Sequence, residues 1–464
     1  MKLERIKKLS LKTYAIALII AFFVGLVLGG AIVYSQSSNE NITIVSGSFT
    51  ETASYIIFRQ GDTYYAKNGT TGVIEFSGTD AASVIQQAID AINGKGHIFI
   101  KSGIYNCYTP ITYNSESFEL YIEGEAAGLY PKTTLGTVLR KCFDGDLLTL
   151  TSSNYNPKAN FRLEKLRFDG QRDYYTGRLV VINGPSWSVI KDCVFRDSYG
   201  NAIRIEKSKV IRLVRCQVYF VQTESGVYLN KVADSQIYDL EVCIGGGEGW
   251  GHTQSTGIAL EIDEGCGLEI FGGHFEGYYG IKTSSQITVI GAHFSLSWSN
   301  NVYIGFAGCS FIGCYFFNPN NGGFSDQKGA NILTISPNVR IIGCYINSGG
   351  KATYGYYGYG SSESLIAHND FYGTFSISPI RFVGGEIYRD NIRVKTENSG
   401  TATISSSTSV TFEHGLAGTP THVEVGWKDT GYGDWKWTAN ATHITITVTN
   451  SGTYSFSWRA YYKP

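Results

Sequence analysis

The sequence predicts an all-β protein whose central part is a parallel β-helix, a single-stranded solenoid of stacked coils. Three observations predict this fold. The 464 residues include 55 Gly and 14% aromatic residues but only 9 Pro and 17% charged residues, which suits many short strands joined by turns. An apolar phrase recurs about every 25 residues from residue 160 onward, as repeat architectures do. An amphipathic segment precedes these copies, where it can cover the end of a solenoid.

The composition and charge exclude several classes of protein. A disordered chain would be poorer in aromatic residues, and a coiled coil would be richer in Ala, Glu, Lys and Leu. The net charge is −1, and the first twelve residues carry five basic side chains against Glu4, so the remainder carries −1 − 4 = −5. A mildly acidic body without a basic stripe argues against nucleic acid as a partner.

The first element, residues 1–35, is predicted to be a basic cytoplasmic tail followed by a transmembrane anchor. Residues 15–33 contain no charge over nineteen positions, which is long enough to cross a bilayer of about 30 Å. Basic residues lie on the N-terminal side, so the body is expected outside the cell. The alternative is secretion after cleavage of a signal peptide, whose apolar region is usually about 7–15 residues long.

The second element, residues 36–79, is predicted to be a linker and a capping hairpin. Gly61-Asp62 and Asn68-Gly69 are turn signals between apolar runs. The segment Asp80–Ile92 follows and places its apolar residues on one face of a helix, with Asp80 as the N-cap. We therefore expect the hairpin and the helix to close the first end of the solenoid.

The third element, residues 80–397, is the predicted β-helix. Its repeated phrase reads IKDCVF up to Phe195, VIGAHF up to Phe294 and IIGCYI up to Ile346. A residue that recurs at one position of each coil stacks on its copy at about 4.8 Å. The residues expected to form this interior column are Leu166, Cys193, Cys216, Cys243, Gly273, Ala292, Cys314, Cys344, Asn369 and Asn391.

The nine cysteines are predicted to be free thiols, five of them in the interior column. Disulfides are the alternative, but in-register neighbours point both side chains the same way, which is poor disulfide geometry. No C-x2-C pair is present, so we predict no metal site. His274 and His293 share one register and are expected to form stacked surface imidazoles, with a metal pair as the alternative.

Residues 72–125 combine an acidic cap, an amphipathic helix, a Gly-rich turn, the KSGIY turn and the sequence IEGE. Together with FDGQRD at 168–173 and the IxxCxF coils, this pattern resembles the pectate lyase superfamily of right-handed β-helices, in its tailspike-like branch. The resemblance covers roughly residues 72–395. It implies the fold, a polysaccharide as partner and, by analogy, a homotrimer or a Ca²⁺ ion; no other cofactor is expected. The family's Asp-Asp pair, Gly-His-Gly turn and Trp-Ile-Asp-His motif are missing from the sequence, so no catalytic residue is carried over.

The fourth element, residues 398–464, is predicted to be a small antiparallel β-sandwich. Residues 443–448 and 454–458 alternate strictly between apolar and polar positions, which indicates a sheet with one buried face. His414-Gly-Leu416 and Gly418-Thr-Pro420 resemble small β-sandwich domains at the tips of phage fibres and of archaeal surface proteins, some of them lectin-like.

The candidate site is the edge formed by the loops that follow each repeated phrase, from Glu224 to Trp298. Acidic residues recur there on three consecutive coils, and aromatic faces suit sugar rings. The predicted catalytic residues are Glu248, Glu276, His252 and Glu224, and the predicted substrate-binding residues are Trp250, Trp298, Tyr278 and Tyr279. The alternative is that these are ordinary solvated loop residues.

Two functions fit these observations. The first is a membrane-anchored protein that binds polysaccharide and cleaves it as a lyase or a hydrolase. The second is a non-catalytic surface or virion-type protein, an adhesin or a structural component. The missing family motifs favour the second function, and the aromatic and acidic loop edge favours the first.

Overall fold

The computed structural model describes residues 52–128, 136–244, 257–359, 363–381, 387–416, 418–428 and 433–462. Within these ranges no helix has both the length and the apolar character needed to cross a membrane. The predicted anchor, residues 15–33, lies outside the described residues.

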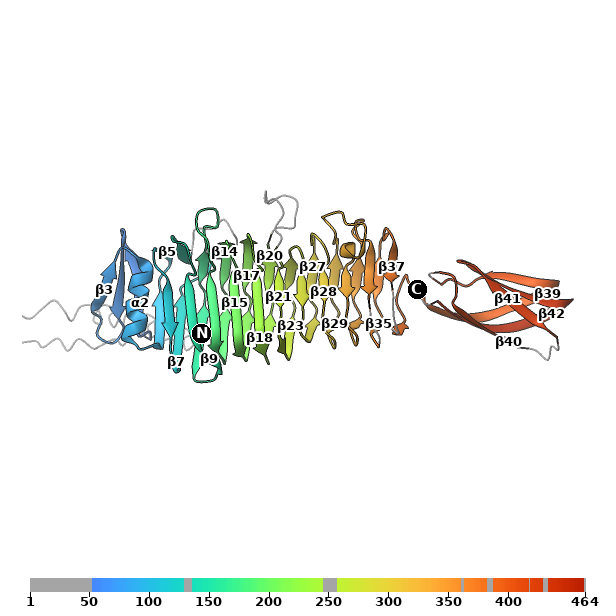
Figure 1. Cartoon of the computed structure of the whole chain (residues 1–464), viewed down its shortest axis with the longest axis horizontal. Coiled ribbons are helices and arrows are strands. Elements are labelled where there is room, and N and C mark those ends of the chain that lie inside the picture. Colours follow the sequence, from blue (N-terminus) through green and yellow to red (C-terminus); the bar gives the residue numbers. More distant parts are fainter. Residues whose placement is uncertain are drawn as a thin grey trace, which may run out of the picture. The chain divides into compact units, whose positions relative to one another are not determined.

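The central part of the chain is a solenoid of three sheets whose stacked coils pair in parallel, here called sheets A, B and C (Figure 1). Each coil contributes one strand to each sheet in the order A, B, C. Sheet A contains β3 (Ile74–Gly78), β2 (Thr63–Asn68), β1 (Tyr55–Gln60), β4 (Lys95–Ile100), β7 (Phe118–Gly124), β10 (Ala159–Glu164), β13 (Ser188–Lys191), β16 (Ile211–Val214), β19 (Gln236–Tyr238), β23 (Leu268–Phe271), β26 (Ile287–Ile290), β29 (Ser310–Ile312), β32 (Arg340–Ile342), β35 (Leu365–Ala367) and β38 (Ile387–Arg389).

The other two sheets complete each coil. Sheet B contains β5 (Gly103–Cys107), β8 (Thr137–Lys141), β11 (Arg167–Asp169), β14 (Val194–Ser198), β17 (Gln217–Val221), β20 (Glu241–Cys243), β24 (His274–Glu276), β27 (His293–Ser295), β30 (Tyr315–Phe317), β33 (Tyr345–Asn347) and β36 (Asp370–Tyr372). Sheet C contains β6 (Ile111–Asn114), β9 (Leu148–Asn156), β12 (Val180–Pro185), β15 (Ile203–Lys209), β18 (Val227–Ala233), β21 (Leu260–Ile262), β22 (Gly265–Cys266), β25 (Ile281–Thr283), β28 (Val302–Ile304), β31 (Ile332–Thr334), β34 (Tyr354–Gly358) and β37 (Ser378–Arg381).

The interior column is present, with one correction. Cys193 and Cys216 are fully buried, and Asn369 donates from Nδ2 to Asn391 Oδ1 at 3.0 Å, as predicted. Gln217 pairs with Glu241, so the residue in register with Cys216 is Leu240. The prediction for Cys243 is therefore wrong. Cys243 lies three residues further along, and an odd shift along a strand turns a side chain to the opposite face.

The corner between sheets A and B explains the Gly of the repeated phrase. The residue just before the column has a positive φ on successive coils, as in Asp192 (52°), Gly291 (68°) and Gly343 (64°). Left-handed backbone is adopted most easily by Gly and, less easily, by Asp or Asn. The repeated Gly thus marks a sharp bend in the backbone.

The cap at the first end confirms the prediction for residues 80–92. Helix α2 (Ala81–Ala91) begins at Asp80, whose side chain accepts a hydrogen bond from the N–H of Ala82. Its apolar face, which includes Val84, Ile85 and Ile89, is fully buried against the solenoid core. Strands β1 to β3 extend sheet A, because β1 pairs parallel with β4 and antiparallel with β2. The predicted hairpin is therefore part of the sheet.

All nine cysteines are free thiols, as predicted. Of the thiols outside the core, Cys266 is exposed, whereas Cys142 and Cys243 are half-buried.

The C-terminal part is antiparallel, as predicted, but its described strands form one sheet instead of two packed sheets. Strand β42 (His443–Tyr461) pairs with β39 (Glu397–Glu413) along one edge and with β40 (His422–Trp427) and β41 (Trp435–Ala439) along the other. Its core includes Ile404, Ile446 and Phe456, and the indoles of Trp427, Trp435 and Trp437 pack against it.

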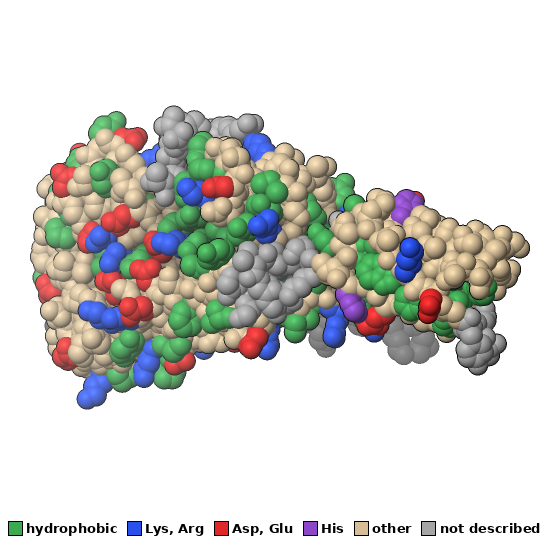
Figure 2. All heavy atoms as spheres, turned by 45° about the vertical axis from the view of Figure 1, so that its right-hand side comes forward, with side chains coloured by type: hydrophobic (Ala, Val, Ile, Leu, Met, Phe, Trp, Pro, Cys, Tyr) green, Lys and Arg blue, Asp and Glu red, His purple; other side chains and the backbone are tan. Residues whose placement is uncertain are grey.

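Charged side chains of both signs are interspersed on the solenoid face that Figure 2 shows. On the solenoid, charged side chains also pair between neighbouring coils, such as Arg215 with Asp192 at 2.7 Å and Lys191 with Glu164 at 3.5 Å. The pair of Arg215 and Asp192 is exposed to solvent and contributes little to stability, whereas Glu164 is buried.

Candidate functional site

The loops between sheets B and C stack on one another along one edge of the solenoid. Backbone hydrogen bonds run from Thr223 N to Tyr199 O at 3.0 Å, from Tyr278 N to Gly257 O at 2.8 Å and from Trp298 N to Gly277 O at 2.9 Å. This arrangement positions side chains from successive loops next to one another. Glu248, Trp250 and His252 lie outside the described residues, so their predicted roles stay predictions.

Glu224 is held by an arginine. Its two carboxylate oxygens accept hydrogen bonds from Arg178 at 3.0 and 3.1 Å, and Oε2 also accepts one from the N–H of Asn201. Burial alone would raise the pKa of Glu224, but the hydrogen bonds and the charge of Arg178 hold that pKa below its ordinary value. Glu224 lines a pocket of about 280 Å³ beside Tyr228 and Glu261.

The three described aromatic residues of the predicted site lie on adjacent loops. The rings of Tyr278 and Tyr279 meet edge to face at 4.9 Å, and Tyr279 also contacts Tyr303 at 5.8 Å. Trp298 lies close to Gly322, where an added Cβ would come within 2.7 Å of the indole Nε1. All three predicted residues are half-buried, so each ring has only part of its surface available to a ligand.

Glu276 lies at the end of β24, on the outer face of sheet B, in contact with His274 and Ser295. Its Oε1 accepts a hydrogen bond from Ser295 Oγ at 2.7 Å and lies 3.1 Å from His274 Nε2. Burial raises the pKa of Glu276, but the hydrogen bonds from His274 and Ser295 outweigh this effect and leave the pKa below its ordinary value. Glu276 is therefore an ionised carboxylate at neutral pH, with 14% of its side chain exposed.

The same outer face carries an aromatic ladder, defined here as His274, His293, Tyr315, Tyr345 and Tyr372. The two imidazoles stack at 4.6 Å with 11° between their planes, as predicted. Tyr315 and Tyr345 stack at 5.2 Å, Tyr345 and Tyr372 stack at 5.7 Å, and the Arg393 guanidinium covers the far side of Tyr372. His293 and Tyr315 instead meet edge to face at 4.8 Å with 76° between their planes. Apart from this step the rings face one another, so the ladder offers mainly ring edges and hydroxyl groups to a ligand.

The contacts of His274 restrict the reactions that this group of residues can catalyse. Both Ser295 Oγ and Glu276 Oε1 approach the same ring nitrogen of His274, Nε2, at 2.8 and 3.1 Å. A nucleophilic serine triad needs the carboxylate on the other ring nitrogen, so these three residues do not form one. An ionised carboxylate beside an imidazole can instead accept a proton or stabilise positive charge on a sugar ring.

Sequence comparison does not assign the chain to a family, since no family model and no curated protein matches it. Solved structures do match. The A-module of a mannuronan C-5 epimerase from Azotobacter vinelandii aligns at 17% identity with a TM-score of 0.50, over 67% of this chain and 96% of that one. A DFA-IIIase from Arthrobacter chlorophenolicus in complex with GF2 aligns at 12% identity with a TM-score of 0.51, over 67% of this chain and 84% of that one. The ORF18 protein of Geobacillus virus E2 aligns at 16% identity with a TM-score of 0.50, over 85% of this chain and 84% of that one.

The chain has the fold of a right-handed parallel β-helix. At these identities the likeness extends to the fold alone, because one fold carries many functions.

Sequence reasoning placed the site on the loop edge and missed most of the neighbouring sheet face. The signal was nevertheless in the repeat. The residue before each interior aromatic or aliphatic side chain of the phrase is His274, His293, Tyr315 or Tyr345 on consecutive coils. Strand residues alternate between faces, so these positions all point outward.

Proposed function

We propose that this protein is a cell-surface β-helix that binds an extended polysaccharide along the outer face of sheet B and acts on it at Glu276. The aromatic ladder is the observation that carries this proposal. It places hydroxyl and imidazole groups on consecutive strands at the spacing of the sheet, next to one ionised carboxylate. The mannuronan epimerase with the same fold acts on a polysaccharide, which supports this substrate class.

In this proposal Glu276 is the base or the charge-stabilising carboxylate, because its lowered pKa makes it a poor proton donor. The proton donor is then one of the two residues predicted from the sequence, Glu248 or His252. Tyr278, Tyr279 and Trp298 border the bound chain at the loop edge, and Trp250 stays a predicted substrate-binding residue. The reaction is an elimination or a hydrolysis at the glycosidic bond.

Removing one ring of the aromatic ladder tests the proposal that the outer face of sheet B binds polysaccharide. We expect Tyr315→Ala to weaken the binding of the full-length protein to a retained polysaccharide at least tenfold, about 1.4 kcal/mol, because Tyr side chains carry much of the energy at binding surfaces. Binding is measured on an array of uronic-acid and neutral polysaccharides. The matched control is Tyr174→Ala, which removes a Tyr with 78% exposure that is not part of the ladder. Equal binding by the wild type and Tyr315→Ala would contradict the proposal.

The same array separates catalysis from binding. Glu276→Gln keeps the size of the side chain and removes its charge, so a catalytic Glu276 predicts retained binding with loss of unsaturated or reducing-end products. A non-catalytic surface or virion-type binding protein is the second candidate function. The two described acids of the predicted site, Glu224 and Glu276, favour this second function. Both have lowered pKa values, so both are ionised and neither is a good proton donor. The second function predicts no product from either protein.

The location of the body is also a proposal, with residues 15–33 as the anchor. We expect protease added to intact cells to degrade the body and to spare an N-terminal fragment, because basic residues on the N-terminal side retain that end in the cytoplasm. Immunoblots with tags at the two ends measure this outcome. A C-terminal tag that survives in intact cells but not in lysed cells would reverse the orientation. Release of the whole body into the medium would instead indicate signal cleavage.

A further inference from the structure

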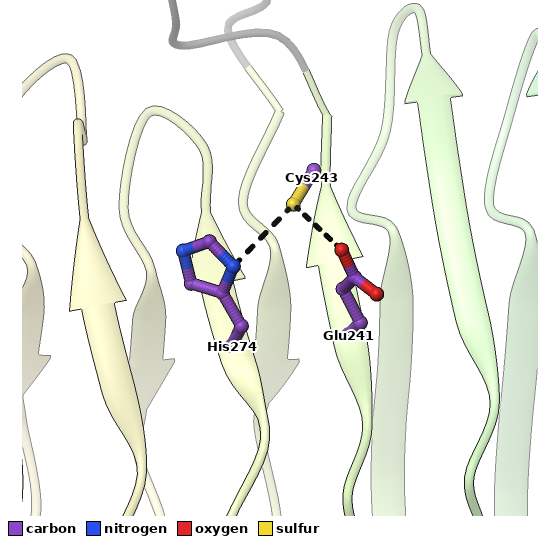
Figure 3. Close-up of side chains that lie close together, drawn as sticks. All are labelled: Glu241, Cys243 and His274. Atoms are coloured by element: carbon purple, nitrogen blue, oxygen red, sulfur yellow. Dashed lines mark hydrogen bonds between the residues drawn. The ribbon is translucent and has the colours of Figure 1, made fainter. Parts of the chain in front are cut away.

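Three side chains of different chemistry, Glu241, Cys243 and His274, converge on the outer face of sheet B (Figure 3), and His274 also contacts Glu276. Glu241 and Cys243 come from β20, two residues apart and therefore on the same face, and His274 comes from the neighbouring strand β24. Cys243 Sγ lies 3.9 Å from Glu241 Oε1 and 3.9 Å from His274 Nδ1. The three ligand atoms all lie within 4.8 Å of one another, and all three residues are half-buried.

The thiol makes a long hydrogen-bond contact of 3.9 Å with each of its two neighbours (Figure 3), and these separations are also compatible with a shared ion. Tetrahedral Zn²⁺ binds nitrogen and oxygen at about 2.0 Å and thiolate sulfur at about 2.3 Å, which places sulfur about 3.6 Å from each of the other two ligand atoms. The observed 3.9 Å is within a few tenths of an ångström of that value. The three atoms lie within 4.8 Å of one another, whereas oxygen and nitrogen ligands of one tetrahedral ion lie about 3.3 Å apart, so the side chains would have to rotate toward one another to bind one ion.

In His274 and Glu241, the second polar atom of the side chain already contacts other residues. His274 presents Nδ1 to the thiol, while its Nε2 lies 2.8 Å from Ser295 Oγ and 3.1 Å from Glu276 Oε1. Glu241 presents Oε1 to the thiol, while its Oε2 accepts a hydrogen bond from Gln217 Nε2 at 3.0 Å. A carboxylate on the second nitrogen of an imidazole, and a hydrogen bond to a ligating carboxylate, are the supports that metal sites characteristically contain.

We propose that Glu241 Oε1, Cys243 Sγ and His274 Nδ1 bind one divalent transition-metal ion of the Zn²⁺ type. Thiolate and imidazole favour Zn²⁺ over the hard cations Ca²⁺ and Mg²⁺, which prefer oxygen ligands. Three protein ligands leave one tetrahedral position for water or for a hydroxyl group of a bound molecule. The metal site goes beyond the proposed function, and it can be tested without any glycan.

The first test uses the full-length chain, stripped with a chelator and titrated with Zn²⁺ alone. We expect one equivalent to bind in calorimetry, and Co²⁺ in its place to show a thiolate-to-cobalt charge-transfer band. Alkylation followed by peptide mass spectrometry gives a readout within one protein: Zn²⁺ should suppress labelling of Cys243 and leave labelling of the exposed Cys266 unchanged. Absence of binding, or equal protection of both thiols, would overturn the proposal.

Variants assign the ligands. Cys243→Ser and Glu241→Gln should each weaken Zn²⁺ binding at least tenfold, and Cys243→Ser should abolish the charge-transfer band. Cys266→Ser is the matched control and should change neither result. A band that persists in Cys243→Ser and disappears in Cys266→Ser would overturn the assignment. Because no glycan is present, failure of the glycan proposal would leave the Zn²⁺ titration unaffected, and the reverse also holds.

Discussion

Replacing Cys216 by Asp should lower the free energy of unfolding by about 4 kcal/mol or more. The Cys216 side chain is fully buried in the interior column, where Sγ donates weakly to the carbonyl oxygens of Ile190 at 3.4 Å and Val214 at 3.6 Å. A carboxylate at this position would have to remain charged in a dry interior or bind a proton at neutral pH. Raising a carboxyl pKa by three or more units costs about 4 kcal/mol or more.

Two control variants separate charge from packing. Cys216→Ala removes one buried sulfur atom and should cost only about 1 kcal/mol. Cys266→Asp places the same new charge at an exposed thiol and should change stability by less than about 0.5 kcal/mol. Urea unfolding followed by circular dichroism measures all three variants. Equal and small effects of Cys216→Asp and Cys216→Ala would show that the position faces solvent.

The column illustrates how much of the fold the sequence can predict. Residues inside the solenoid meet their own copies, so the sequence repeats, and the positions of Cys193 and Cys216 could be identified from spacing alone. The error at Cys243 has the same origin. The residue in register is Leu240, but the phrase was aligned on the recurrent Cys. Leu240, Val242 and Ile244 are all buried, whereas Glu241 and Cys243 point outward, so the alternation of apolar residues was a better criterion for the register than the recurrence of Cys.

The candidate site was harder to predict, because its residues come from different coils. Glu241 and His274 pair across strands at a separation of 33 residues, and His274 meets Ser295 across another 21. Stacking predicts which loops are neighbours, and this was enough to place Glu276 near Tyr278 and Trp298. It does not give side-chain rotamers. The pairing of Glu224 with Arg178, which holds the carboxylate ionised, therefore required the structure.

A second large effect is expected at alkaline pH, because the interior contains several protonated thiols. Burial raises the pKa of Cys216 from an ordinary value of 9.0 to about 12 and that of Cys309 to about 11. Burial also raises the pKa of Cys107 and Cys193 well above 9.0. A thiolate of an unfolded chain is hydrated, whereas a thiolate in this column would lack a partner for its charge.

The direction of this pH dependence follows from the number of protons that the folded and unfolded states bind. Above pH 9 the unfolded chain loses its thiol protons while the folded chain retains them, so the unfolded state binds fewer protons and stability falls as pH rises. Each such thiol contributes fully below pH 9 and loses about 1.4 kcal/mol per pH unit until its folded-state pKa is reached. For Cys216, with a folded-state pKa of about 12, the loss between pH 9 and pH 11 is about 3 kcal/mol.

Comparison of the wild type with Cys216→Ala isolates this contribution, because the titration of Tyr and Lys is common to both proteins. We expect Cys216→Ala to be less stable than the wild type at pH 8 and to become the more stable protein by pH 11. This reversal follows because the alanine variant lacks one proton-linked loss of about 3 kcal/mol. Urea-unfolding midpoints at pH 8, 9, 10 and 11 measure it, with Cys266→Ala as the control for an exposed thiol. Parallel curves for the wild type and Cys216→Ala would mean that the thiol ionises as readily in the folded column as in water, and a dry interior could not produce that behaviour.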